Sequence, residues 1–310
     1  MSQDTKTIKT KMATVGNLKK ITKAMEMVAR GKMKKAVSNA LNARYYAKFA
    51  LELLVNLSED KDNGSPFLVS PKTGEKVLFL HIASNKGLCG GYNASLFRSL
   101  SMRLEKNERE NVDVVAVGKY AARHGGKIGV SVIKRFDNIS EDIKVAETEE
   151  LCDFAINSFL AGKYKKVFVS YANFVSAFKQ EPVARQLLPV SKESLIETLE
   201  KSGGEEDLIH IDREKDLSIG NKSVYIFEPS EAAVLEIVVP KLIRSQIYQS
   251  LLEAGASEQS ARMVAMKNAN ESANKMSKEL LLSYNKARQA GITKEILEIV
   301  AGAESSLSSL

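Results

Sequence analysis

Hydrophobic residues recur at steps of mostly three and four along the first part of the chain, which predicts one long helix from about Asp4 to about Leu57. The recurring positions are Ile8, Met12, Val15, Leu18, Ile21, Met25, Val28, Val37, Leu41, Tyr45, Phe49, Leu53 and Leu57. A helix of about 50 residues is about 75 Å long, far more than a compact domain needs. Turn-forming residues from Asp60 to Pro66 mark its end.

A second long helical pattern fills the end of the chain. Pro229 followed by Ser230 is a helix start signal, and from there to about Gly302 the only proline is Pro240. About 70 residues would form a helix of about 105 Å. Apolar seams of this length normally require a partner helix, so we expect the two terminal helices to pair as an antiparallel coiled coil.

The middle of the chain alternates apolar runs with helical patterns. Strands are expected at 77–83, 112–117, 166–171, 187–190 and 224–227, and helices at about 93–106 and 147–160. Strands that alternate with helices indicate parallel βαβ units. The expected fold class is therefore α/β, with a Rossmann-like α/β domain inserted between the two helices of the coiled coil. The expected domains are a first helix (1–58), an α/β domain (59–229) with a charged loop at about 191–223, and a second helix (230–310).

Composition excludes several classes of protein. No apolar run reaches the roughly 18 to 20 residues that span a bilayer, and residues 1–14 lack the apolar core of a secretory signal. Cys89 and Cys152 provide neither a disulfide framework nor a zinc site, which favours a reducing compartment.

The positive charge of the chain is concentrated in the first expected helix. Residues 1–50 carry twelve Lys or Arg and two acidic residues, whereas the formal net charge of the whole chain is +7. Such a helix could bind nucleic acid, lie on an anionic membrane, face acidic protein surfaces or simply face water. Because an apolar seam runs along its whole length, a basic coiled-coil surface with a protein partner is favoured over a free membrane helix.

The glycine-rich stretch 86–91 follows an expected strand and precedes an expected helix, where phosphate-binding loops occur. It matches neither G-x-G-x-x-G nor G-x-x-x-x-G-K-[ST], so we favour a tight structural turn at Gly87, Gly90 and Gly91 over nucleotide binding. Cys89 has no His nearby in sequence that would mark it as a nucleophile.

The three histidines are isolated in the sequence. His81 lies in an apolar run, and His124 and His210 are expected in loops or near helix ends. No metal-binding spacing and no G-x-S-x-G elbow occurs, so we expect no metal, no cofactor and no catalytic residue.

Four segments together resemble the gamma subunit of F-type ATP synthases, in the right order over nearly the whole chain. They are Ile21–Ala29, Gly87–Asn93, Ala256–Met266 and Asn285–Glu295. The resemblance implies a non-catalytic central rotor shaft, whose terminal helices lie inside a ring of three alpha and three beta subunits. The α/β domain would lie against the epsilon subunit and the c-ring. Rotation driven by ion flow would then shift each beta subunit between conformations of different affinity for ADP, phosphate and ATP.

The resemblance also implies roles for individual positions. Met25, Arg262, Gln289, Thr293 and Glu295 match positions that contact beta subunits, and Tyr225, Phe227 and Glu228 match the foot at the c-ring. The apolar end with Ile296, Ile299 and Val300 would form the top bearing. From charge alone, we add Lys23, Arg30, Lys32 and Lys35 as candidates for the acidic lever loop of beta. Plain coiled-coil packing remains the simpler alternative for each position.

The expected location is the cytoplasmic face of a bacterial plasma membrane, with membrane contact only through the complex. A bacterial protein is favoured because no transit peptide and no cysteine-rich regulatory insert of the chloroplast type is evident. The alternative function is a nucleic-acid-binding coiled-coil protein, supported by the basic helix but lacking a known DNA-binding motif. A nucleotide-binding enzyme is less favoured, because the phosphate-binding motifs are missing.

Overall fold

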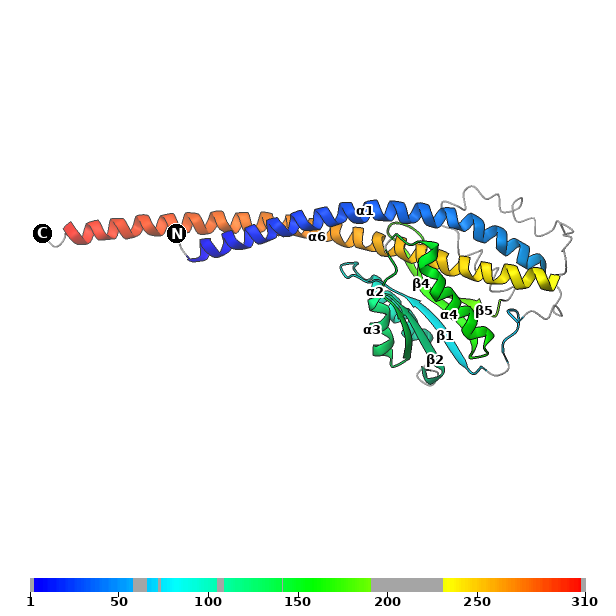
Figure 1. Cartoon of the computed structure of the whole chain (residues 1–310). Coiled ribbons are helices and arrows are strands. Elements are labelled where there is room, and N and C mark those ends of the chain that lie inside the picture. The colour runs from blue at the N-terminus through cyan, green and yellow to red at the C-terminus, as the bar shows by residue number, and fades with distance from the viewer. Residues whose placement is uncertain are drawn as a thin grey trace. The chain divides into compact units, whose positions relative to one another are not determined.

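The computed structural model describes residues 3–57, 66–71, 74–104, 109–140, 142–190 and 231–307 (Figure 1). The chain forms two compact units. One, here called the helix-pair unit, comprises Met1–Val28 and Met263–Leu310, and the other, the α/β unit, comprises Ala29–Arg262. Both terminal helices therefore contribute residues to both units.

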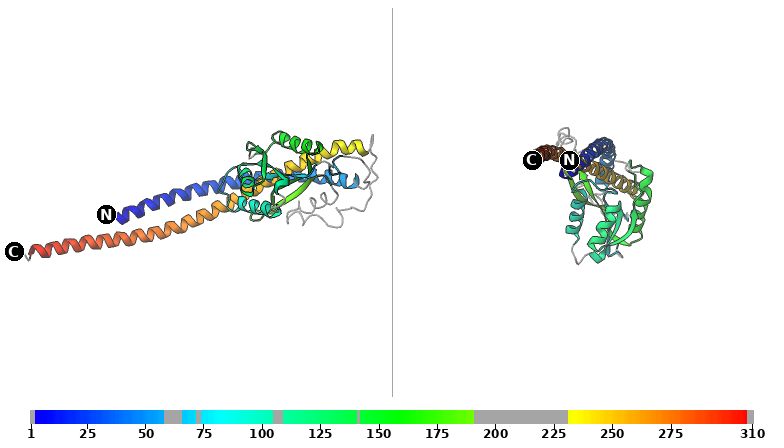
Figure 2. Two further views of the ribbon diagram at one scale, coloured as in Figure 1. Left: turned by 90° about the horizontal axis from the view of Figure 1, so that it is seen from below. Right: turned by 90° about the vertical axis from the view of Figure 1, so that its left-hand side faces the viewer.

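The two terminal helices are as long as their apolar periodicity predicts. Helix α1 covers Gln3–Leu57 and helix α6 covers Glu231–Leu307, with Pro240 inside α6. Within the helix-pair unit, the first part of α1 and the stretch of α6 beside it run in opposite directions, and the end of α6 extends beyond the start of α1 (Figures 1 and 2). The side-chain amide of Asn270 on α6 donates to the carbonyl oxygen of Lys19 on α1 at 3.4 Å. The expected antiparallel pairing is therefore confirmed in this unit.

The buried face of α1 in the helix-pair unit follows the predicted seam at Val15 but departs from it at Leu18 and Ile21. Thr22 and Glu26 are buried, whereas Ile21 is 56% exposed and Met25 is only half-buried. Small or polar residues are buried on α6 as well, including Asn270 and Ala273. The prediction that the apolar stripe forms the buried seam is therefore wrong at Ile21, because the helices pack so that the neighbouring Thr22 is buried instead.

A five-stranded sheet forms the centre of the α/β unit. Its strands are β1 (Lys76–Ile82), β2 (Val112–Val117), β3 (Ser131–Phe136), β4 (Tyr164–Phe174) and β5 (Gln180–Leu188). They lie in the order β3-β2-β1-β4-β5. The first four are parallel and β5 is antiparallel to β4, so the expected parallel βαβ arrangement is confirmed.

Helices cover both faces of this sheet. Helices α2 (Tyr92–Arg103) and α3 (Lys119–Ile128) pack on one face, where Leu100 and Ile128 contact the cluster around Phe79. Helix α4 (Glu149–Leu160) and α6 share the opposite face, where Phe159 and Ile247 join the cluster around Leu80. Neighbouring residues of β1 thus belong to opposite layers, as the alternation of a strand requires. Short 3₁₀ helices lie at η1 (Arg109–Asn111) and η2 (Val145–Thr148).

Two elements were absent from the sequence prediction. Helix α3 contains two adjacent glycines, Gly125 and Gly126, which weaken a helical pattern. Strand β3 is an edge strand with no fully buried residue, so it lacks the continuous apolar run of β1 and β2. The strand expected at 187–190 is the end of the longer β5. The strand expected at 224–227 and the charged loop at 191–223 lie outside the described residues.

Candidate functional site

The glycine-rich loop lies between β1 and α2, as the sequence predicts. Two of its residues adopt positive φ angles, Leu88 at 62° and Gly90 at 58°. Glycine takes this conformation readily, whereas Leu88 takes it at a cost in backbone strain and leaves its side chain 62% exposed. Gly91 is the residue before the first turn of α2, and a Cβ at Gly87 would lie 3.0 Å from the hydroxyl of Tyr120. The three glycines therefore lie in a tight turn.

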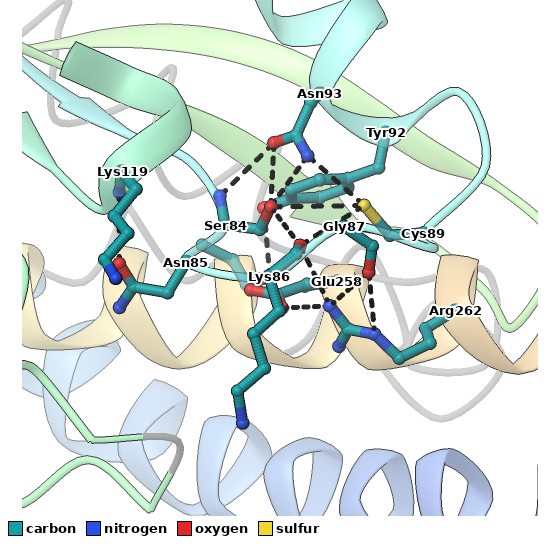
Figure 3. A network of polar contacts seen from close by, with 11 residues as sticks. Ser84, Asn85, Lys86, Gly87, Cys89, Tyr92, Asn93, Lys119, Glu258 and Arg262 are labelled. Atoms are coloured by element: carbon teal, nitrogen blue, oxygen red, sulfur yellow. Dashed lines mark hydrogen bonds and ion pairs between the residues drawn. The ribbon is translucent and has the colours of Figure 1, made fainter. Parts of the chain in front are cut away.

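Polar side chains inside the loop hold its two ends together (Figure 3). The amide of Asn93 donates to Oγ of Ser84 at 2.7 Å and to Sγ of Cys89 at 3.3 Å. The hydroxyl of Ser84 donates to the carbonyl oxygen of Lys86 at 2.8 Å. Burial raises the pKa of the Cys89 thiol, and the positive charge of Arg262 offsets part of that rise. The thiol is therefore protonated at neutral pH and suited to packing rather than to nucleophilic attack.

Arg262 joins this loop to α6 (Figure 3). Its guanidinium donates to the carbonyl oxygens of Lys86, at 3.3 Å, and Gly87, at 3.3 and 3.4 Å. It also pairs with the carboxylate of Glu258 at 2.6 Å, one helical turn earlier. Its side chain is 9% exposed. The sequence resemblance places Arg262 at a contact with a beta subunit, and the structure shows that its guanidinium has partners within its own chain.

The position where open α/β sheets bind ligands is occupied by α6. In such sheets the ligand lies at the carboxyl ends of the strands where the strand order reverses, here β1 and β4. The loop after β1 contacts Arg262 of α6, and the hydroxyl of Ser257 on α6 donates to the carbonyl oxygen of Ala172 on β4 at 2.8 Å. Just beyond β4, the hydroxyl of Ser260 donates to the carbonyl oxygen of Ala177. This helix fills the place that a nucleotide would need.

A buried pair of histidines lies on the face of the sheet that α2 and α3 cover. Nε2 of His81 is 3.0 Å from Nδ1 of His124, and Nδ1 of His81 is 3.3 Å from Oγ of Ser170. Burial lowers the pKa of His81 to about 3 and that of His124 to about 4. The expectation that His124 lies in a loop or near a helix end is wrong, because it is buried within α3. Among the described residues, no group of three or more His, Cys, Asp or Glu side chains could hold a metal ion.

The basic residues proposed for an acidic partner occupy different surroundings. Lys23, in the helix-pair unit, is exposed and pairs with Glu26 at 3.1 Å. Arg30 and Lys32 are exposed residues of the α/β unit. Lys35 pairs with Asp142 at 2.8 Å, and that contact lowers the pKa of the Asp142 carboxyl.

The candidate residues at the end of α6 are exposed. Gln289, Thr293 and Glu295 lie on its surface, and the hydroxyl of Thr293 donates to the carbonyl oxygen of Gln289 at 3.0 Å. The proposed bearing residues Ile296, Ile299 and Val300 are 56%, 71% and 49% exposed. Tyr225, Phe227 and Glu228, proposed for the foot, lie outside the described residues.

Large apolar side chains are exposed on both helices of the helix-pair unit. They are Leu18, Ile21, Met27 and Val28 on α1, and Met276, Leu281, Leu282, Ile292, Ile296, Leu297, Ile299 and Val300 on α6. Scattered exposed apolar residues are ordinary, but a set of this size on two paired helices is typical of a surface that a protein partner covers. The sequence showed the apolar positions, but their exposure depends on which face of each helix meets the other and on how far α6 extends beyond the start of α1 (Figure 1).

These features define a class of protein: an α/β domain combined with two paired terminal helices whose outer faces are suited to binding other proteins. Comparison with known proteins identifies the family. A family described as "ATP synthase" matches residues 4–305. The ATP synthase gamma chain of Pelotomaculum thermopropionicum is 35% identical over 296 residues, covering 96% of each chain. That of Polynucleobacter asymbioticus is 36% identical over 308 residues, covering 96% of this chain and 98% of its own.

The chain therefore belongs to the ATP synthase gamma chain family. A chain of the Euglena gracilis mitochondrial ATP synthase, in a structure of OSCP, F1 and the c-ring in rotational state 3, has a similar fold, with a TM-score of 0.65 and 19% identity. The match covers 97% of this chain and 94% of that one, and at this identity it shows the fold alone.

In the part of the chain that the structure describes, no helix is both long and apolar enough to cross a membrane.

Proposed function

We propose that this chain is the central rotor shaft of an F-type ATP synthase and is not itself catalytic. In this role it couples ion-driven rotation of a c-ring to conformational cycling of the catalytic beta subunits, in the direction of either ATP synthesis or hydrolysis. A shaft that makes different contacts with alternative conformations of beta shifts the equilibrium between them. The family membership and the occupied ligand position of the α/β unit both support this proposal over a nucleotide-binding enzyme.

The observation that carries the proposal is the outer surface of the helix-pair unit. It combines exposed apolar residues such as Ile21 and Ile299 with an exposed Lys23. A surrounding ring of alpha and beta subunits would cover the apolar residues, and acidic loops of beta would be attracted to the lysine. Exposed ion pairs contribute roughly 0 to 1 kcal/mol each, so such contacts would guide a turning shaft without locking it.

The proposed contacts follow the resemblance. Met25, Lys23, Arg30, Lys32, Lys35, Gln289, Thr293 and Glu295 would face beta subunits, and Ile296, Ile299 and Val300 would form the bearing. Arg262 also matches a position that contacts beta, but its side chain is only 9% exposed, so it would act from behind this surface. Tyr225, Phe227 and Glu228 would meet the c-ring, and the α/β domain would bind the epsilon subunit. In this arrangement the protein would lie at the cytoplasmic face of a bacterial plasma membrane, held there through the complex.

Reconstitution with alpha, beta and epsilon subunits of the same organism tests the proposal. We expect a stable complex whose ATPase activity depends on this chain. Met25→Cys, paired with a cysteine in the acidic loop of beta, should form a disulfide that stops turnover, and a reductant should restore it. Met102→Cys on α2, where Met102 is 77% exposed, is the control for non-specific oxidation.

Two results would contradict the shaft. One is an alpha–beta complex whose activity and composition are unaffected by this chain. The other is a purified chain that binds duplex DNA tightly and ignores the ATP synthase subunits, which would favour the nucleic-acid-binding alternative. A cross-linked complex that continues to turn over at the full rate would remove Met25 from the proposed contact.

A further inference from the structure

Arg262 is a buried cation whose guanidinium donates hydrogen bonds to the glycine-rich loop. Three acceptors surround its guanidinium: the carboxylate of Glu258 and the carbonyl oxygens of Lys86 and Gly87. Bonds from a charged donor are stronger than neutral ones, and leaving a buried charge without its acceptors is costly. The contact between α6 and the glycine-rich loop is therefore a strong one for its size.

The same stretch of α6 is held from two sides. Ala254, Glu258 and Arg262 are spaced four residues apart and share the face toward the loop, where the hydroxyl of Tyr92 donates to the carbonyl oxygen of Ala254 at 3.2 Å. Ser257 and Ser260 face β4 and the turn after it. Helix α6 is thus fixed between the segments that follow β1 and β4.

We propose that Arg262 is a positioning residue: it latches the glycine-rich loop closed against α6 and acts on function through that loop. The effect of the latch on activity rests on the proposed function as a rotor shaft. In a rotor, part of the force passing from the sheet and its loops to α6 would cross this latch, so a loosened latch would let the loop move without the helix. The latch itself is a property of the chain alone and is tested separately.

The geometry requires arginine rather than lysine. A guanidinium has several N–H donors in one plane, so it reaches two carbonyl oxygens and a carboxylate together, whereas an ammonium is a single point of charge. We therefore expect Arg262→Lys to retain part of the latch and Arg262→Ala to lose it. Lys294→Gln is the matched control, because Lys294 pairs with Glu298 four residues along the same helix, at 3.7 Å, and both are exposed.

Alkylation of Cys89 reports whether the loop is closed. Cys89 is buried inside the loop, and Cys152, buried on α4, serves as the internal reference in the same molecule. In the purified full-length chain at neutral pH, mass spectrometry gives the alkylation rate of each thiol. We expect Arg262→Ala to raise the Cys89 rate at least tenfold with Cys152 unchanged, Arg262→Lys to give an intermediate rate, and Lys294→Gln to match the wild type.

The direction in which the alkylation rate of Cys89 changes distinguishes opening of the loop from the loss of the positive charge of Arg262. The positive charge of Arg262 lowers the pKa of Cys89, so its removal alone reduces the thiolate fraction and slows alkylation. Faster alkylation therefore requires that the loop opens. An unchanged or slower Cys89 rate in Arg262→Ala overturns the latch, and so does a parallel rise at Cys152, because that shows unfolding of the whole unit.

The functional consequence is measured in the reconstituted membrane complex. We expect Arg262→Ala to reduce ion-driven ATP synthesis several-fold more than ATP hydrolysis, with Arg262→Lys between this variant and the wild type. Equal losses of both activities would contradict a role in force transfer and would leave direct contact with beta as the better account. If the wild-type chain does not assemble with the other subunits, the shaft proposal is wrong. The alkylation experiment on the purified chain still tests the latch in that case.

Discussion

At the scale of single residues, the α/β unit contains polar side chains whose environment sets their chemistry. His81 and His124 come from β1 and α3 and share a hydrogen bond in a buried layer, next to the ring of Phe97. Tyr164 donates to the buried carboxylate of Asp113 at 2.9 Å, across the sheet. Buried polar groups of this kind are tolerated because each has a partner, and they make the packing specific.

The histidine pair makes the fold sensitive to acid. The folded-state pKa values of about 3 for His81 and about 4 for His124 lie below the ordinary value of 6.5, so unfolding takes up protons. We expect the stability that the pair contributes to be fully present above about pH 6.5 and to be lost as the pH drops from there toward 3. NMR titration of the imidazoles measures the pKa values, and His210→Gln removes the third histidine signal. A pKa near 6.5 for His81 in the folded protein would contradict the burial of the pair.

At the scale of elements, the junctions between strands and helices depend on a few backbone positions. Gly118 connects β2 to α3 with a φ of 92°, and a Cβ there would lie 2.2 Å from the carbonyl oxygen of Ala83. A Cβ at Gly126, inside α3, would have no neighbouring atom within 4 Å. Two glycines near each other in sequence thus have different roles: one is required by the turn, and the other only weakens its helix.

This difference predicts opposite effects of the same substitution. We expect Gly118→Ala to destabilise the chain by about 3 kcal/mol, because of the clash and the positive φ. Gly126→Ala should stabilise it by up to about 1 kcal/mol, since alanine favours the helix. Urea unfolding of the full-length chain measures both. Equal effects at the two positions would show that the turn at Gly118 tolerates a side chain.

At the scale of the whole molecule, the two units differ in how they bury apolar surface. The α/β unit contains a continuous core that includes Leu80, Val169 and Phe159. In the helix-pair unit, residues such as Thr22, Glu26 and Asn270 are buried, and large apolar residues such as Ile21 are exposed. Most of the stability of helices in proteins comes from packing an apolar face, so the helix-pair unit gains less from folding alone.

Hydrogen exchange tests this contrast. In the free chain we expect amides of 5–28 and 264–300 to exchange at least tenfold faster than those of β1 and β4, because local opening exposes little apolar surface. In the reconstituted complex these segments should become protected, and Ile21→Gln should reduce that gain while leaving the free chain unchanged. Equal protection of the two units in the free chain would show that the helix pair is stable without a partner.

The elements with strong patterns follow from the sequence alone. Apolar periodicity predicted both terminal helices, and continuous apolar runs predicted β1 and β2, because these signals arise from local spacing. The motifs around Met25, Cys89, Arg262 and Gln289 identified the family. Helix α3 and strand β3 were missed, since paired glycines and a half-exposed edge strand leave weak patterns.

The contacts of those residues, in contrast, depend on the tertiary structure. The partners of Arg262 in the glycine-rich loop are about 175 residues away in the chain, so no spacing reveals that its charge is buried against Lys86 and Gly87. His81 and His124 look isolated in sequence and meet only because β1 and α3 are packed together. The face of α1 that meets α6 is set by how the two helices pack, which buries Thr22 and leaves the adjacent Ile21 exposed. Local pattern fixes what each segment becomes, whereas long-range packing fixes which side chains are buried, paired or left for a partner.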